Sequence, residues 1–179
     1  MKPQDVLRYY GNLLSDYERT EILEYPEVYF IGLPTAAKIK ATMSSELNFG
    51  FDEENGDYKY MLSDHIGYRY EIVKFLGKGS FGTALQCLDH KTGKEIALKL
   101  IKNKQKYLQV AGVELKILEF LKKNDPEDIM NVVHLSKYFM FRRHLCICFE
   151  LLSMNLYEFL KVNDFNVSLN RGNNSNLGL

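Results

Sequence analysis

The stretch Gly77-Lys78-Gly79-Ser80-Phe81-Gly82 carries three glycines in six residues, and its two flanks decide which fold it belongs to. Tyr70 to Leu76, before the glycines, is rich in aromatic and β-branched residues, as strands are. Thr83 to Leu88, after them, is short and strand-like, and turn residues follow at 89–93. The glycines are therefore expected to join two antiparallel strands. A dinucleotide-binding fingerprint would need a helix that begins at the glycines, so a nicotinamide-linked oxidoreductase is disfavoured.

Glycines in such a turn have a direct chemical use. Without a Cβ they let backbone amides approach phosphate oxygens, which is what a flap over a triphosphate requires. The six-residue pattern alone is not specific, but Lys94 to Lys102 adds to it. This segment alternates as a strand and places Lys99 on the same face as Ala97. A lysine between apolar neighbours is costly to bury unless an anion pairs with it.

A helix is expected over Tyr107 to Lys123, and Glu114 lies beside its apolar stripe. Taken singly, Glu114 could be a solvated helix charge and Lys99 a lysine whose ammonium reaches water. The order of glycines, strand lysine and helix glutamate favours an ion pair between the two instead. Gly112, inside this helix, is expected to cost about 1 kcal/mol relative to alanine. The stripe comprises Val110, Val113, Ile117, Leu118 and Leu121, and the residues expected to face outward are Lys116, Glu119, Lys122 and Lys123.

Two further apolar runs, Val132 to Phe141 and His144 to Leu151, are joined by Arg142-Arg143 and are expected to form a hairpin. The segment Ser153 to Glu158 then begins another helix. Its Asn155 and Glu158 are spaced like an N-cap residue and its capping-box partner. The chain therefore has the pattern of a mostly antiparallel sheet with one long helix inserted before the last hairpin.

Several longer stretches resemble the DYRK family, the dual-specificity kinases regulated by tyrosine phosphorylation. Residues 64–71, with the acidic run 52–58 before them, resemble the DYRK homology box that precedes the kinase domain. Residues 149–158 are similar to the family's linker between lobes. Upstream, residues 14–18 and 21–33 resemble the NAPA accessory region of one DYRK subgroup, which implies support for tyrosine autophosphorylation. The resemblance covers roughly Leu14 to Leu169.

The resemblance implies an α+β fold: a protein kinase N-terminal lobe, with a five-stranded antiparallel sheet plus one main helix. An α/β accessory region would precede this lobe, and the C-terminal lobe would be absent. The implied divisions are an accessory region at 1–62, the homology-box core at 63–69, the lobe at 70–152, the linker and following helix at 153–169, and a disordered tail at 170–179.

The resemblance also implies roles for single residues. Lys99 would contact the α/β-phosphates of ATP, and Glu114 would be its ion-pair partner. Ala84 stands where the family pattern has valine, which removes apolar cover over the adenine and could weaken binding by about 1 kcal/mol. The implied cofactor-binding residues are Gly77, Lys78, Gly79, Ser80, Phe81 and Gly82 in the flap, Ala84, Ala97 and Lys99 on the strands, Phe149 as gatekeeper, Glu150 and Leu152 through their backbone, and Asn155 near the ribose.

Composition narrows the class of protein. The 23 Lys and Arg residues balance the 23 Asp and Glu residues, and no basic stripe predicts a nucleic-acid partner. No apolar run reaches the length of a membrane span, and the N-terminus lacks the apolar core of a signal peptide. The three cysteines form no C-x-x-C pair, which favours reduced thiols and a cytoplasmic or nuclear location over a metal or disulfide role.

The sequence contains no H-R-D-x-x-x-x-N segment with a catalytic base and no D-F-G metal ligand. No metal-binding residues are therefore expected here, and Mg²⁺ is expected only in a full-length form that also takes protein substrates. The polar stretch from Asn170 to Leu179 suggests truncation, and the chain by itself is expected to be inactive. The alternative is a genuine short protein, a noncatalytic lobe that associates with a partner through its exposed face.

Overall fold

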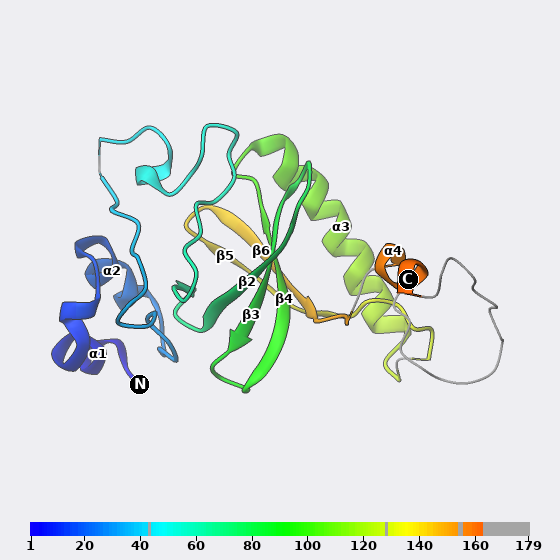
Figure 1. Cartoon of the computed structure of the whole chain (residues 1–179), viewed down its shortest axis with the longest axis horizontal. Helices are drawn as coiled ribbons and strands as arrows, with labels where there is room; N and C mark the ends of the chain where they lie inside the picture. Colours follow the sequence, from blue (N-terminus) through cyan, green and yellow to red (C-terminus); the bar gives the residue numbers. More distant parts are fainter. Residues whose placement is uncertain (43, 128, 154–155, 163–179) are drawn as a thin grey trace.

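The computed structural model describes residues 1–42, 44–127, 129–153 and 156–162. Its centre is an antiparallel sheet with the strand order β1-β2-β3-β4-β6-β5 (Figure 1). The five expected strands are present, and a two-residue strand, β1, adds a sixth at the edge beside β2. The strands are β1 (His65–Ile66), β2 (Tyr70–Lys78), β3 (Gly82–Asp89), β4 (Lys94–Ile101), β5 (Leu135–Phe141) and β6 (His144–Glu150).

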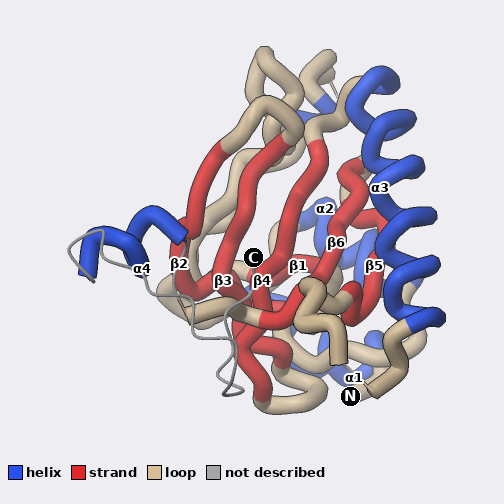
Figure 2. Tube along the Cα trace, turned by 90° about the vertical axis from the view of Figure 1, so that its right-hand side faces the viewer, coloured by secondary structure: helices blue, strands red, loops and turns tan. Residues whose placement is uncertain are grey.

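The sheet lies between two layers, as Figures 1 and 2 show from two directions. Helix α3 (Gln105–Asn124) covers one face, alongside β6 and β5. The described residues among the first 62 lie on the opposite face and include α1 (Pro3–Tyr10) and α2 (Asp16–Glu21). A last short helix, α4 (Leu156–Val162), follows the sheet, while Asn155 and the tail at 170–179 lie outside the described residues. No helix in the described ranges is both long enough and apolar enough to cross a membrane.

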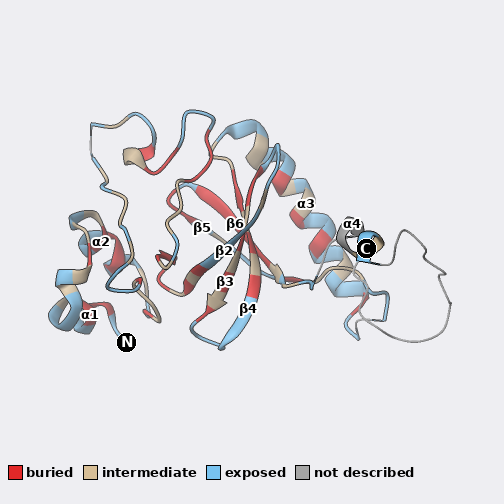
Figure 3. Ribbon diagram, viewed as in Figure 1, coloured by how far each residue is buried: buried red, intermediate tan, exposed pale blue. Residues whose placement is uncertain are grey.

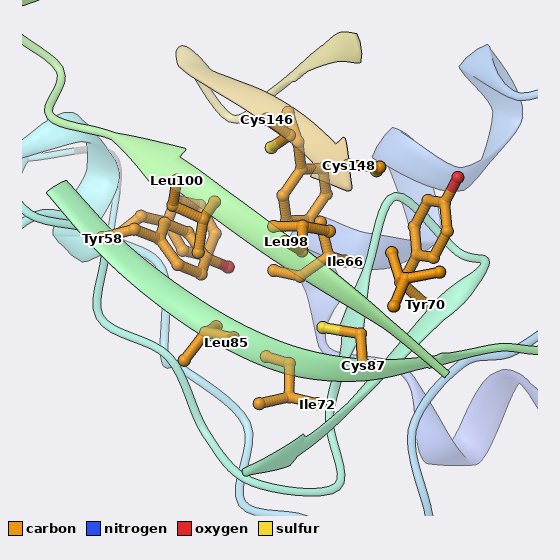
Figure 4. Close-up of a cluster of buried hydrophobic side chains, with 13 residues drawn as sticks. Tyr58, Ile66, Tyr70, Ile72, Leu85, Cys87, Leu98, Leu100, Cys146 and Cys148 are labelled. Atoms are coloured by element: carbon orange, nitrogen blue, oxygen red, sulfur yellow. The ribbon is translucent and has the colours of Figure 1, made fainter. Parts of the chain in front are cut away.

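The core between the sheet and the N-terminal segment contains all three cysteines (Figure 4). Cys87, Cys146 and Cys148 are buried free thiols, and burial raises the pKa of Cys148 to about 11. Cys146 and Cys148 lie on one face of β6, as the period of two requires. The other members of the cluster come from the sheet and from the N-terminal region: Phe51, Tyr58, Ile66, Tyr70, Ile72, Leu85, Ile96, Leu98, Leu100 and Phe141.

The expectation for which face of α3 is buried was wrong in part: Leu118 is buried as expected, but most of the expected stripe is not. Ala111, Leu115 and Leu118 meet the sheet, whereas Val113 and Ile117 are 58% and 55% exposed. Figure 3 shows buried and exposed stretches alternating along α3. The helix has apolar residues on two sides, and periodicity cannot tell which side packs when both are apolar. Gly112 is an interior helical residue, and a Cβ placed there would meet no atom within 4 Å. No close approach of another group requires glycine at this position. Its cost relative to alanine is the larger loss of backbone entropy when glycine is ordered in a helix.

The region before the sheet differs from the expected mixture of helices and strands. Within its described residues it has two helices, several 3-10 turns and one isolated bridge between Asp52 and Tyr58. The extended segment around Tyr29 does not form a ladder of hydrogen bonds with a neighbouring strand. The amides of Tyr29 and Phe30 instead both donate to the Tyr68 carbonyl, at 2.9 and 3.1 Å. One such acceptor cannot propagate a sheet, so the segment stays irregular.

A buried ion cluster fastens this region to the sheet. Arg142, at the β5–β6 turn, donates to Glu21 of α2 at 2.8 Å and to the Tyr58 hydroxyl at 2.9 Å. Arg142 and Arg143 both have positive φ, of 44° and 65°, as a two-residue hairpin turn of this twist requires. That turn aims the Arg142 guanidinium inward, where it lies 4.1 Å from the centre of the Phe51 ring.

The same cluster brings together side-chain atoms of Glu18, Asp64 and His65 that could act as metal ligands, within 4.8 Å of one another. A metal is not needed to neutralise them, because the Lys38 ammonium contacts both carboxylates. His65 accepts a hydrogen bond from the Tyr68 amide at Nδ1, so its Nε2–H donates to Glu18 at 2.9 Å. Burial would raise the pKa of Glu18, but hydrogen bonding by His65 and the charge of Lys38 lower it below its ordinary value.

Candidate nucleotide-binding site

Lys99 and Glu114 form an ion pair on the face of the sheet that α3 covers. The Lys99 ammonium lies 2.7 and 3.0 Å from the two carboxylate oxygens of Glu114. The pair is partly open to solvent, with side-chain exposures of 29% and 36%. Within the described part of the chain, both hydrogen bonds of this ammonium go to Glu114, which leaves an N–H for a ligand.

Strand register explains why Lys99 faces this way. In β4, Ile96, Leu98 and Leu100 are buried in the cysteine-containing core, so Lys99 and Ala97 take the opposite face. Cross-strand partners share a face, and Lys99 pairs with Ala84 of β3 and with Ile147 of β6. Ala84, Ala97 and Lys99, three of the predicted site residues, therefore lie on one surface.

The glycine stretch forms the turn between β2 and β3, as expected. Its amide at Gly79 donates to the Gly82 carbonyl at 2.9 Å, which closes the turn. The Phe81 carbonyl accepts from the Lys102 amide at 2.9 Å, and the Phe81 and Tyr107 rings pack in a T shape with their centroids 5.8 Å apart. These contacts fold the tip of the turn back toward the start of α3. We call residues 77–82 the flap.

The three glycines of the flap are needed for different structural reasons. A Cβ at Gly77 or Gly79 would meet no protein atom within 4 Å. A Cβ at Gly82 would lie 1.9 Å from the carbonyl oxygen of Leu100. Gly82 is therefore needed by the fold itself, whereas the open space beside Gly77 and Gly79 fits the close approach of a phosphate group.

Phe149, Glu150 and Leu152 lie at or just past the end of the sheet away from the flap. Phe149 pairs with Ala97 across β6 and β4 and is partly buried against the α3 side of the core. The Glu150 carboxylate accepts from the His134 amide at 3.2 Å, so its side chain turns toward the start of β5. Leu152 is 43% exposed just past β6. Ser80 is exposed in the flap, and Asn155 falls outside the described residues.

One contact of the flap was not anticipated. The Lys78 ammonium lies 2.8 Å from the Oδ2 atom of Asp57 and 3.5 Å from the Oε2 atom of Glu53. Contact with Asp57 raises the pKa of the Lys78 ammonium above its ordinary value. The run of acidic residues at 52–58 was visible in the sequence, but it carries no sign of which lysine it would meet.

Comparison with known proteins agrees with this geometry. The sequence pattern of the family described as the protein kinase domain matches residues 70–174, more than half of the chain. The chain belongs to the protein kinase family. The match begins at the first residue of β2 and takes in the flap, Lys99 and Glu114.

The similarity to DYRK kinases covers more than the sheet. Over 161 residues, 90% of this chain, the sequence is 48% identical to human dual specificity tyrosine-phosphorylation-regulated kinase 4. It is 46% identical over 92% of its length to a putative Drosophila melanogaster homologue of kinase 3 of that series. A probable serine/threonine-protein kinase of Dictyostelium discoideum is 48% identical over 91% of this chain.

These matches make the chain a DYRK-type kinase sequence. Only 110 residues lie from Tyr70 to the last residue, so an alignment of 161 residues also includes part of the region before the sheet. The chain spans 31%, 20% and 18% of the length of these three relatives. Protein kinases use ATP with Mg²⁺, and the residues that would receive the nucleotide here remain a prediction.

Proposed function

We propose that this chain provides the ATP-binding lobe of a DYRK-type protein kinase. The observation that carries the proposal is the Lys99–Glu114 ion pair, held on the face of the sheet next to the flap. Such a pair keeps a cation in place before the nucleotide arrives, so the phosphates need not order a free lysine side chain. Gly77 and Gly79 would admit the phosphates closely, and Ala84 and Ala97 would face the adenine.

The whole protein would transfer the γ-phosphoryl group of ATP to serine and threonine hydroxyls of protein substrates, and to its own tyrosine. In that reaction Mg²⁺ would neutralise phosphate charge. The residues here would bind and orient the nucleotide, while the catalytic base and the metal ligands would come from sequence outside these 179 residues. We propose that the chain by itself binds ATP and does not transfer phosphate.

ATP affinity of the purified chain tests this role, measured by titration with ATP and Mg²⁺. Lys99→Met is expected to weaken binding about 10- to 100-fold, because it removes a charge-assisted contact of about 1.5–3 kcal/mol. Lys94→Met, an exposed lysine at the start of the same strand, is the matched control and is expected to bind within about 2-fold of the parent. Absence of ATP binding by the parent chain, or unchanged binding by Lys99→Met, would contradict the proposal.

The outer side of α3 supports a second candidate, a noncatalytic module that associates with a protein. Val110, Val113, Ile117 and Phe120 are 49–65% exposed and recur at helical spacing. An apolar stripe of this kind on a free surface favours association. Sedimentation of the parent chain and of Ile117→Glu would test it: a self-associating or partner-bound parent and a monomeric variant, with no ATP binding by either, would favour this candidate over the first.

The cysteines bear on location. All three are buried in one cluster, and none forms a disulfide bond. We propose a reducing compartment, the cytoplasm or the nucleus, on this basis. Imaging of the tagged full-length protein would test it, and recovery from an oxidising compartment would contradict it.

A further inference from the structure

Residues 52–58, which we call the acidic turn, are held firmly by the fold. The turn is closed by the Asp52–Tyr58 bridge and by a 2.8 Å hydrogen bond from the Glu53 amide to the Asp57 carbonyl. Phe51 and Tyr58, which flank or end it, are 1% and 4% exposed in the core beneath the sheet. The acidic turn is therefore a rigid feature, and charges mounted on it have fixed positions.

The acidic turn is also tied to the segment between β4 and α3. The Asn103 amide donates to the Gly56 carbonyl at 2.8 Å, and the Asn103 side chain donates to Asp52 at 2.8 Å. That segment also holds the flap tip, since the Lys102 amide donates to the Phe81 carbonyl. The acidic turn and the flap thus share an anchor in the segment that directly follows the strand carrying Lys99.

Asp57 is the one member of the turn that reaches the flap from a buried position. Its side chain is 2% exposed, and neither carboxylate oxygen accepts a well-directed hydrogen bond among the described residues. Its counter-charges are the ammonium groups of Lys78 at 2.8 Å and Lys102 at 3.7 Å. A buried carboxylate with so few donors depends strongly on nearby cations, so it holds the Lys78 side chain in place.

Lys78 lies between Gly77 and Gly79, and these two glycines have no side chains to hold the flap. At this end of the flap, Gly77 pairs with Ala84 and Lys78 with Thr83 of β3, and the side-chain attachment to the acidic turn is the contact of Lys78 with Asp57 and Glu53. Glycines cost conformational entropy to order, and a tether next to them lowers what the nucleotide must supply when it binds.

We propose that Asp57 is a positioning residue for the nucleotide: through Lys78 it holds the flap in the conformation that receives the phosphates. The Lys78 ammonium is directed to the acidic turn and not to the nucleotide. The inference rests on the proposed ATP binding, but the tether itself exists without ATP and can be measured without it.

Two measurements on the purified chain test the proposal. The first is hydrogen exchange of the flap amides without nucleotide, and the second is the Kd for ATP with Mg²⁺. Asp57→Asn and Lys78→Met are each expected to speed exchange at residues 77–82 and to weaken ATP binding about 3- to 10-fold. Combining the two should add nothing further, because either change breaks the same contact. Glu54→Gln, an exposed residue of the same turn, is the matched control and should match the parent in both measurements.

Each other outcome has a definite meaning. Unchanged exchange and unchanged Kd in both variants would overturn the proposal, as would additive effects in the double variant. Weaker binding by Lys78→Met with tighter binding by Asp57→Asn would also overturn it, since Lys78 would then serve the phosphates and Asp57 would compete for it. If the parent does not bind ATP, the proposed function fails, and faster flap exchange in the variants would still establish the tether. Lys78 is 43% exposed in its side chain, so its variant remains informative even if Asp57→Asn fails to fold.

Discussion

Gly82 offers a sharp test of the reasoning, because the three flap glycines are predicted to respond differently to alanine. In Gly82→Ala the new Cβ would lie 1.9 Å from the Leu100 carbonyl oxygen and 2.9 Å from its carbon. Both are backbone atoms of the neighbouring strand, so no side-chain rotation relieves the clash. The β3–β4 pair must open at the Gly82–Ile101 position, where the flap ends.

The cost follows from what that opening disrupts. The hydrogen bond within the turn, from Gly79 to Gly82, and the one from Lys102 to Phe81 both depend on this end of the strand pair. At about 0.5–1.5 kcal/mol each, their loss contributes about 1–3 kcal/mol. Forcing a methyl group into a packed site adds about 1–3 kcal/mol more. Gly82→Ala should therefore lower the free energy of unfolding by about 2–6 kcal/mol.

Urea unfolding followed by circular dichroism measures this difference, and a thermal scan should show a Tm lower by about 5–15 °C. Gly79→Ala is the matched control: its Cβ would meet nothing within 4 Å, so its free energy of unfolding should stay within about 0.5 kcal/mol of the parent. Equal stability of the two variants would refute the argument. It would mean that the strand pair yields at Gly82 without the cost assigned to it.

The buried ion cluster supplies the remaining predictions. Arg142→Gln should lower the free energy of unfolding in urea by about 3–5 kcal/mol, because it leaves the Glu21 carboxylate buried without its cation. Arg143→Gln, at the exposed neighbouring residue, should lower it by less than about 1 kcal/mol. Similar losses in both variants would contradict the buried Arg142–Glu21 pair. The pKa of Glu18 is lowered in the folded chain, so its contribution to stability is present above its ordinary value near pH 4.5 and is lost as the pH falls further. Urea midpoints measured from pH 6 down to pH 3 should show this loss in the parent, and Glu18→Gln should be less stable at pH 6 and show a smaller loss; parallel curves would argue against the Glu18 assignment.

Much of the sheet was predictable because strands and their faces follow local rules. The alternation over Lys94 to Lys102 assigned Lys99 and Leu98 to opposite faces, and the structure has them so. The Arg142-Arg143 turn was also readable, because two apolar runs separated by two residues form a hairpin. The strand expected from Val132 begins at Leu135, since the ends of elements depend on pairing that a single run does not reveal.

The face of α3 shows where local pattern stops being sufficient. Leu118 was expected to be buried and is, but Val113 and Ile117 were expected to join it and are exposed. Ala111 and Leu115, on the other side, pack on the sheet instead. Both sides satisfy a helical period, so the choice between them depends on how the helix packs against the sheet, and in the observed rotation Glu114 reaches Lys99.

By itself, the sequence determined the order of strands and helix, the glycine turn, and the identity of the lysine and glutamate that could meet a nucleotide. These depend on periodicity and on residue chemistry over short stretches. Only the tertiary structure decided which carboxylate holds the flap and which side of α3 stays open. The pairs Asp57–Lys78 and Glu21–Arg142 join residues far apart in the chain, and such contacts depend on the path of the backbone between them, which no local pattern encodes.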